Sequence, residues 1–127
     1  MNPALDRFLD DSVPAKYRPM VMALTTLIEN VTPDLLLRMG DEYHKDMIVP
    51  VWGNIDDAIV LVPSKSGLII EFVHGASFLD PFDLLQGQGR TARRLKLRHM
   101  TDFDQEALAF LIREAARLDA DLVGGVS

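Results

Sequence analysis

Two apolar strand patterns in the middle of the chain constrain the fold more than any other feature. Residues 58–62 and 68–73 are short runs of mostly apolar, often β-branched residues, which is typical of strands that contact a core. The segment Pro63-Ser64-Lys65-Ser66-Gly67 separates them and contains the residue types that make tight turns. This part of the sequence therefore predicts an antiparallel β-hairpin.

Helical patterns precede the hairpin. Apolar residues recur at helical spacing over residues 3–11 and again from Met20 to Val31. Ser12 is the expected N-cap of a helix that restarts at this point. Pro19 is expected to kink that helix or to begin a second segment, because proline cannot donate the main-chain hydrogen bond of a helix interior.

A second helical pattern ends the chain. Its apolar face predicts a helix from about Phe103 to Leu118. Asp102 and Gln105 resemble a capping box at its start. Residues 119–127 are expected to be a frayed tail.

The other segments of the chain have weaker patterns, which indicate one helical turn and three further strands. Asp80 is expected to cap a single helical turn that begins at Pro81. Three further strands are expected at Leu35–Met39, Met47–Trp52 and Arg93–His99. Runs of strands and runs of helices favour an α+β fold. We expect one domain over residues 1–127, with N-terminal helices, a mainly antiparallel sheet of about five strands and a long C-terminal helix.

Composition excludes several classes of function. The chain has no cysteine, which excludes disulfides, thiolate metal sites and cysteine nucleophiles. Its start lacks the pattern of a signal peptide, and its apolar runs are too short to span a bilayer, so we expect a cytoplasmic protein with no membrane partner. A net charge of −6 argues against general nucleic-acid binding.

One short stretch of this acidic chain is strongly basic. Five of the 13 basic residues lie between Arg90 and Arg98, directly after a flexible Gly-x-Gly. Strand alternation over this stretch places Leu95 and Leu97 on the core side and the cations on the other face. The candidates for binding an anion are Gly87, Gly89, Arg90, Arg94, Lys96 and Arg98. A second interpretation is an edge strand whose charges pair with acidic neighbours or prevent aggregation.

The order of several short blocks resembles that of a known family. The blocks are Tyr17-Arg18-Pro19, Val31-Thr32-Pro33-Asp34, Ile69-Ile70-Glu71-Phe72 followed by Gly75-Ala76, Leu79-Asp80-Pro81, and Leu84–Arg90 continuing into Leu95–Arg98. Together they cover roughly residues 4–118 and are similar to the YdhG-like family (domain-of-unknown-function family 1801). The resemblance implies an α+β fold and, for some relatives, a frataxin-like role as an intracellular iron chaperone. Iron is the one cofactor that it implies.

Two further residue sets are candidate sites. Asp41, Glu42, His44 and Asp46 carry oxygen and nitrogen ligands of the kind that suits iron or manganese, although a solvated polar loop has the same composition. Tyr43, Trp52, Phe72, His74 and Phe78 combine aromatic rings with one titratable group, which suits a ligand pocket and equally suits ordinary core packing.

No residue pattern indicates catalysis, and we name no catalytic residue. The serines and the three histidines lie in no nucleophile-elbow or similar motif. We expect a non-enzymatic binding module for a small anionic ligand or metal complex. The alternatives are an intracellular iron chaperone and a homodimeric interaction module that associates through an exposed strand edge.

Overall fold

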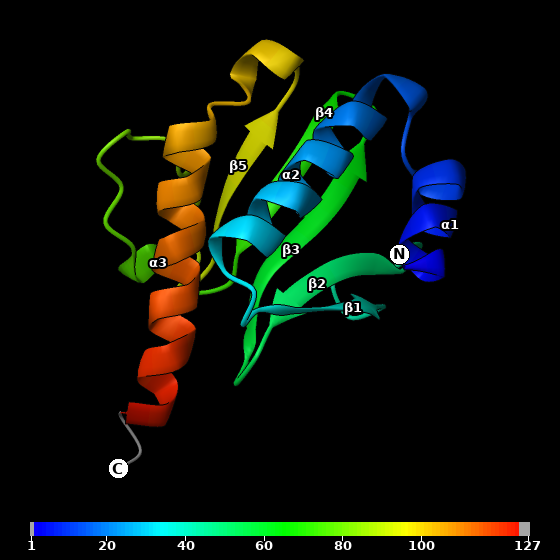
Figure 1. The fold of residues 1–127 in the computed structure, drawn as a ribbon. Coiled ribbons are helices and arrows are strands. Elements are labelled where there is room, and N and C mark those ends of the chain that lie inside the picture. The colour runs from blue at the N-terminus through cyan, green and yellow to red at the C-terminus, as the bar shows by residue number, and fades with distance from the viewer. Residues whose placement is uncertain (1, 125–127) are drawn as a thin grey trace.

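A computed structural model describes residues 2–124 and gives them an α+β fold (Figure 1). The helices are α1 (Pro3–Ser12), α2 (Arg18–Val31) and α3 (Gln105–Gly124), and the strands are β1 (Leu36–Gly40), β2 (Val49–Gly53), β3 (Asp57–Ser64), β4 (Gly67–Phe72) and β5 (Arg93–Leu97). Three short 3-10 turns lie at Ala15–Tyr17, Gly75–Ser77 and Met100–Asp102 within these described residues. The predicted fold class is confirmed.

The five strands form one antiparallel sheet in chain order, β1-β2-β3-β4-β5. The predicted hairpin is β3–β4, which closes tightly because Ser64 pairs with Gly67. A glycine is needed there, since a Cβ atom on Gly67 would lie 2.6 Å from the carbonyl oxygen of Leu97 in β5. The turn thus also allows the hairpin to pack closely against the next strand.

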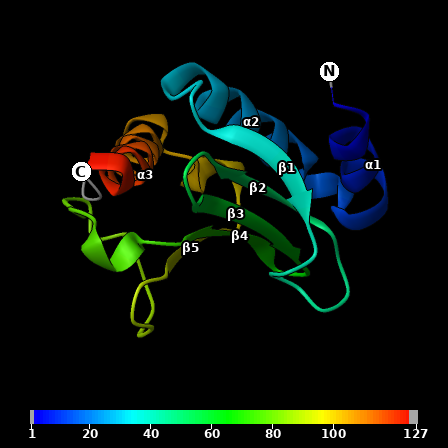
Figure 2. The ribbon, with the colours of Figure 1, turned by 90° about the horizontal axis from the view of Figure 1, so that it is seen from below.

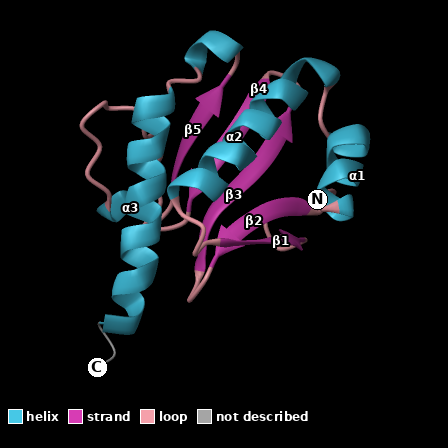
Figure 3. Ribbon diagram, in the orientation of Figure 1, coloured by secondary structure: helices cyan, strands magenta, loops and turns pink. Residues whose placement is uncertain are grey.

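Helices α2 and α3 cover one face of the sheet (Figures 1 and 3). The side chains of Ile59, Leu61, Ile70 and Phe72 alternate onto the covered face and are fully buried. Helix α1 lies at one end of this layer beside α2 (Figure 2). Within residues 2–124 no helix has the length and apolar character needed to cross a bilayer.

The N-terminal helices differ from the prediction in their caps. Pro19 lies in the first turn of α2 and starts it, in agreement with one of the two expected outcomes. Ser12 is wrong as an N-cap, because it is the last residue of α1. The side chain of Arg18 occupies the end of α1 instead and donates to the carbonyl of Leu9 at 2.9 Å.

The C-terminal helix begins later and ends later than predicted. Asp104 caps it by accepting from the Ala107 N–H at 3.1 Å. Asp102 instead accepts from the N–H groups of Arg98 and His99, so the proposed capping box is wrong. The helix continues to Gly124, so residues 119–124 are not frayed. Residues 125–127 lie outside the described residues.

The segment after β4 contains a turn where a helical turn was predicted. The Asp80 carboxylate does accept hydrogen bonds from main-chain N–H groups that follow it, those of Leu84 and Leu85, at 3.1 and 3.0 Å. No helix follows, however, because Asp83 adopts a φ of 52°, which ends a right-handed helical path. The chain then reaches Gln86, which pairs with Arg94 of β5.

The face of the sheet opposite α2 and α3 carries no helix, and we call it the open face. On β3, β4 and β5 its residues are Val60, Val62, Ile69, Glu71, Arg94 and Lys96. Figure 2 shows that the loop between β1 and β2 and the loop before β5 both extend to this side. They flank the open face at opposite ends of the sheet.

Candidate functional site

The basic residues of β5 lie on the open face as the alternation predicts. Arg94 pairs across the sheet with Glu71 and Lys96 with Ile69, whereas Leu97 between them is 1% exposed on the core side. Arg98 follows directly after the strand. We refer to Arg94, Lys96 and Arg98 as the β5 cations.

Carboxylates lie near two of the β5 cations, since Glu71 stands opposite Arg94 and Asp102 accepts from the main-chain N–H of Arg98. Within residues 2–124, Arg94, Lys96 and Arg98 lie in no ion pair shorter than 4.0 Å, and the same is true of Arg90. Lys96 donates from its Nζ atom to the Ser66 hydroxyl at 2.6 Å, a neutral acceptor. The interpretation in which these charges pair with acidic neighbours therefore stays an alternative, with nearby carboxylates but no close ion pair in the described residues.

An apolar strip adjoins these cations. Val62, Ile69 and Lys96 stand side by side on neighbouring strands, because Val62 pairs with Ile69 and Ile69 pairs with Lys96. Val62 and Ile69 are half-buried. The open face near β5 thus offers positive charge beside apolar surface, which suits a ligand that is anionic and partly apolar.

Arg93 shapes the loop that leads into β5 and was missed among the sequence candidates. Its Nη1 atom donates to the carbonyls of Gly89 and Ala92 at 2.6 and 2.8 Å. Its side chain is half-buried against Gly75, where an added Cβ atom would lie 2.7 Å from the Cβ of Arg93. Strand alternation could have identified Arg93, because it puts this residue on the same side as Leu95 and Leu97.

The aromatic and histidine candidates divide between the core and the loops. Trp52 and Phe72 are buried core residues, and the ring of Phe78 packs on Phe72 at 5.3 Å. The Tyr43 hydroxyl donates to Asp57 at 2.6 Å, and burial together with this carboxylate raises the pKa of Tyr43 well above its usual range. His74 contacts Asp56 at 3.1 Å. These contacts are those of packing and loop fixation.

The acidic loop candidates do not converge. Glu42 pairs with Arg38 at 2.7 Å, and this guanidinium lowers the pKa of the Glu42 carboxyl. The Nδ1 atom of His44 accepts from the Asp46 N–H at 3.0 Å. Over residues 2–124 no three histidine, aspartate or glutamate side chains are placed to hold a metal ion.

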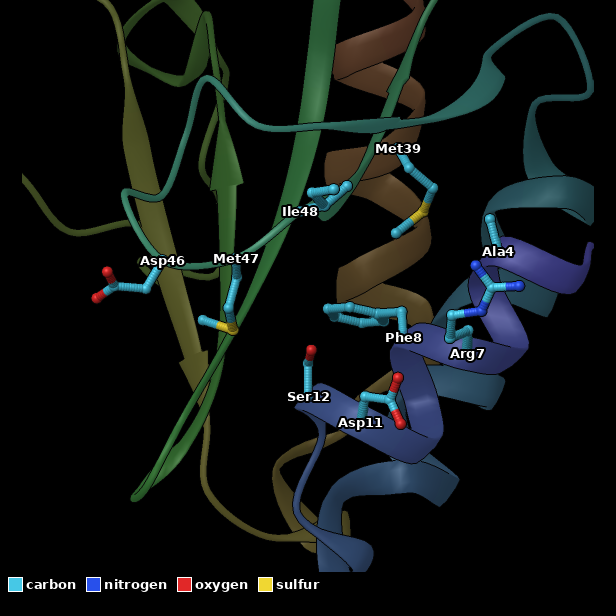
Figure 4. Close-up of a pocket in the computed structure, with 9 residues that line it drawn as sticks. All are labelled: Ala4, Arg7, Phe8, Asp11, Ser12, Met39, Asp46, Met47 and Ile48. Atoms are coloured by element: carbon cyan, nitrogen blue, oxygen red, sulfur yellow. The ribbon is translucent and has the colours of Figure 1, made fainter.

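Two cavities lie at the two ends of the sheet. One, of about 400 Å³, lies between α1 and the β1–β2 loop, where Phe8, Met39 and Met47 line it and Asp46 extends away from Phe8 (Figure 4). The other, of about 380 Å³, lies along β5 beside Phe82, and Lys96, Arg98, Asp102 and Asp104 border it. The second cavity therefore has both basic and acidic side chains at its border.

No family model, curated protein or solved structure matches the chain. Membership of the YdhG-like family therefore stays a prediction from the sequence blocks, and the function must be argued from the geometry.

Proposed function

We propose that the protein is a non-enzymatic binding module for a small polyanion, or for an anionic metal complex, on the open face at β5. The observation that carries this proposal is the row of β5 cations, which form no ion pair shorter than 4.0 Å within the described residues. Such a row in a chain with net charge −6 concentrates positive potential at one place.

The spacing of the row indicates the kind of ligand. Alternate residues of a strand are about 6.6 Å apart, so one small anion contacts one or two of these side chains. A ligand with two or more negative groups contacts more of them. Exposed ion pairs contribute only about 0.2–1 kcal/mol each, whereas a millimolar complex needs about 4 kcal/mol. The ligand must therefore also use the apolar strip formed by Val62 and Ile69.

Titration calorimetry with matched aromatic acids tests this proposal. Isophthalate, with two carboxylates, is expected to bind more tightly than benzoate, with one. Comparing citrate with ferric citrate shows whether the protein prefers a free polyanion or its metal complex. The double variant Arg94→Ala/Lys96→Ala should weaken binding at least about tenfold, which is 1.4 kcal/mol. Arg113→Ala on α3, also exposed and outside the described ion pairs, is the matched control.

Two results would overturn the proposal. The first is that isophthalate, citrate and ferric citrate all fail to bind. The second is that the double variant binds as the wild type does while Arg113→Ala also has no effect.

The iron-chaperone role implied by the resemblance has less support. It requires hard oxygen ligands that converge on one ion, and the acidic loop at Asp41–Asp46 does not provide them in the described structure. Anaerobic titration with ferrous iron remains its direct test.

Self-association through β1 is a second candidate. Large apolar side chains surround this edge strand, since Leu36 is 65%, Ile48 59% and Ile55 52% exposed. A second copy could pair with the same edge about a two-fold axis. Sedimentation over a range of concentrations should then show a dimer, and Leu36→Lys should shift it to monomer. A wild type that is monomeric at all concentrations would exclude this candidate.

A further inference from the structure

The loop formed by residues 87–92 uses its carbonyl groups internally. Gly89 and Ala92 direct their carbonyl oxygens to the guanidinium of Arg93. The carbonyl oxygen of Thr91 accepts from the Ala76 N–H at 2.8 Å. Three carbonyls of one short loop are therefore fixed by partners on its inner side.

The same contacts turn main-chain donors away from the protein. Every peptide bond in the described chain is trans, so the N–H of one residue points opposite to the carbonyl of the residue before it. Because the Gly89 and Thr91 carbonyls point inward, the N–H groups of Arg90 and Ala92 point outward. Neither N–H donates to an acceptor elsewhere in residues 2–124.

Positive charge lies on both sides of these donors. Arg93 is half-buried beneath the loop and forms no ion pair with a described residue. Arg90 is exposed on the loop itself, and Arg94 begins the β5 row where the loop ends. Convergent main-chain N–H groups in a glycine-rich loop with nearby cations form a concave anion site.

From these contacts we infer that residues 87–92 bind a phosphate group, held by the N–H groups of Arg90 and Ala92 and by the Arg90 guanidinium. The inference rests on the proposed function, because this phosphate would be one of the negative groups of the ligand. Donors on separate residues match the three oxygens of a phosphate. The two-pronged contact of a single arginine fits a carboxylate and a phosphate alike, so a carboxylate control is needed to distinguish the two.

Amide chemical shifts in a ¹⁵N-labelled protein test the inference directly. Inorganic phosphate and phenyl phosphate are the probes, and benzoate is the carboxylate control with the same ring as phenyl phosphate. We expect both phosphates to shift the Arg90 and Ala92 amides and benzoate to leave them nearly unchanged. If phenyl phosphate binds more tightly than inorganic phosphate, the ligand is a phosphate monoester. If the two bind equally, the ligand is the free phosphate anion.

Variants of the loop separate its parts. Arg90→Ala should weaken phosphate binding about tenfold, because a hydrogen bond to a charged group is lost. Gly87→Ala should weaken it too, since Gly87 has a φ of 133° that other residues rarely adopt. Arg113→Ala is the matched control, because Arg113 is an exposed cation on α3, outside the loop. Arg93→Met keeps the packing on Gly75 but releases the carbonyls, and should abolish the amide shifts while isophthalate still binds.

The outcomes distinguish this inference from the proposed function. Shifts confined to Arg94–Arg98 with every anion would overturn the phosphate loop and leave the β5 site in place. Equal shifts of Arg90 and Ala92 with benzoate and phenyl phosphate would overturn the assignment to phosphate. No shift at the loop or at β5 with phosphate, phenyl phosphate or isophthalate would overturn both.

Discussion

Two buried acidic residues of α3 hold loops against this helix. Asp119 is 2% exposed, and its two carboxylate oxygens accept from the N–H groups of Ile55 and Asp56 at 3.0 and 2.9 Å. Glu114 is 7% exposed and accepts from the Leu79 N–H at 2.9 Å. Burying a carboxylate is costly unless it accepts hydrogen bonds. Each of these acids therefore holds one loop in place through the N–H groups that it accepts from.

Replacing Asp119 should destabilise the domain more than its position near the chain end suggests. Asp119→Ala leaves two N–H groups without acceptors and should lower the free energy of unfolding by about 2–3 kcal/mol. Asp119→Asn keeps one acceptor oxygen and should lower the free energy of unfolding by about half as much. Urea unfolding of both variants measures this, with Asp121→Ala on the exposed side of α3 as the control. Equal stability of Asp119→Ala and Asp121→Ala would contradict the role assigned to Asp119.

Glu114 should make stability depend on pH in the acid range. Hydrogen bonds from Arg117, helped by the Leu79 N–H and opposed by burial, lower the pKa of the Glu114 carboxyl. A lowered folded-state pKa stabilises the fold above the unfolded pKa, about 4.3, and that contribution is lost as pH falls through the folded value. Glu114→Gln should therefore be less stable than wild type at about pH 7, with a gap that narrows towards about pH 3. Urea midpoints at both pH values measure the gap, and a constant gap would contradict this account.

At the scale of elements, Arg18 joins the two N-terminal helices. Its Nε atom donates to the Leu9 and Val13 carbonyls at 2.9 and 3.3 Å, and a terminal nitrogen donates to the Asp10 carbonyl at 3.3 Å. These carbonyls lie at the end of α1, where helical partners are missing. One side chain at the start of α2 therefore completes the preceding helix.

Arg18→Lys should loosen α1 without unfolding the domain. Lysine keeps the charge but cannot reach three carbonyls with a planar fork, so we expect a loss of about 1 kcal/mol in the free energy of unfolding. Amide hydrogen exchange should become faster in α1 and remain unchanged in α3. Uniformly faster exchange in all helices would contradict this prediction.

The elements themselves could be predicted because their patterns are local. The β3–β4 hairpin depends on neighbouring apolar runs and a turn, and α2 on one apolar face. Their ends could not be predicted, because distant contacts set them. The extension of α3 past Leu118 includes Asp119, which reaches the turn between β2 and β3. Likewise Asp102 accepts a hydrogen bond from the Arg98 N–H at the end of β5, and Asp104 caps α3 in its place.

The candidate site was predictable in part for the same reason. Alternation alone placed Arg94 and Lys96 on the open face. It could not show that they form no close ion pair in the described structure, since that depends on how the side chains of other strands are placed. The role of Arg93 depends on the path of a loop that no local pattern specifies.

For the whole molecule, the two edges of the sheet are protected differently. At β5, the main chain of Arg94 exchanges two hydrogen bonds of 2.8 Å with Gln86, and the Arg98 N–H is capped by Asp102. At β1, by contrast, exposed Leu36 lies on the strand itself. A further strand can therefore add at β1 more readily than at β5.

This asymmetry predicts that self-association and anion binding are independent. A dimer formed through β1 leaves β5 and the loop 87–92 at the far edge of the sheet. Leu36→Lys should therefore lower the sedimentation coefficient at high protein concentration and leave the isophthalate affinity unchanged. Conversely, Arg94→Ala/Lys96→Ala should weaken isophthalate binding and leave the sedimentation profile as in wild type. If either variant changed both measurements, the two edges would be coupled, and association would have to involve the open face near β5.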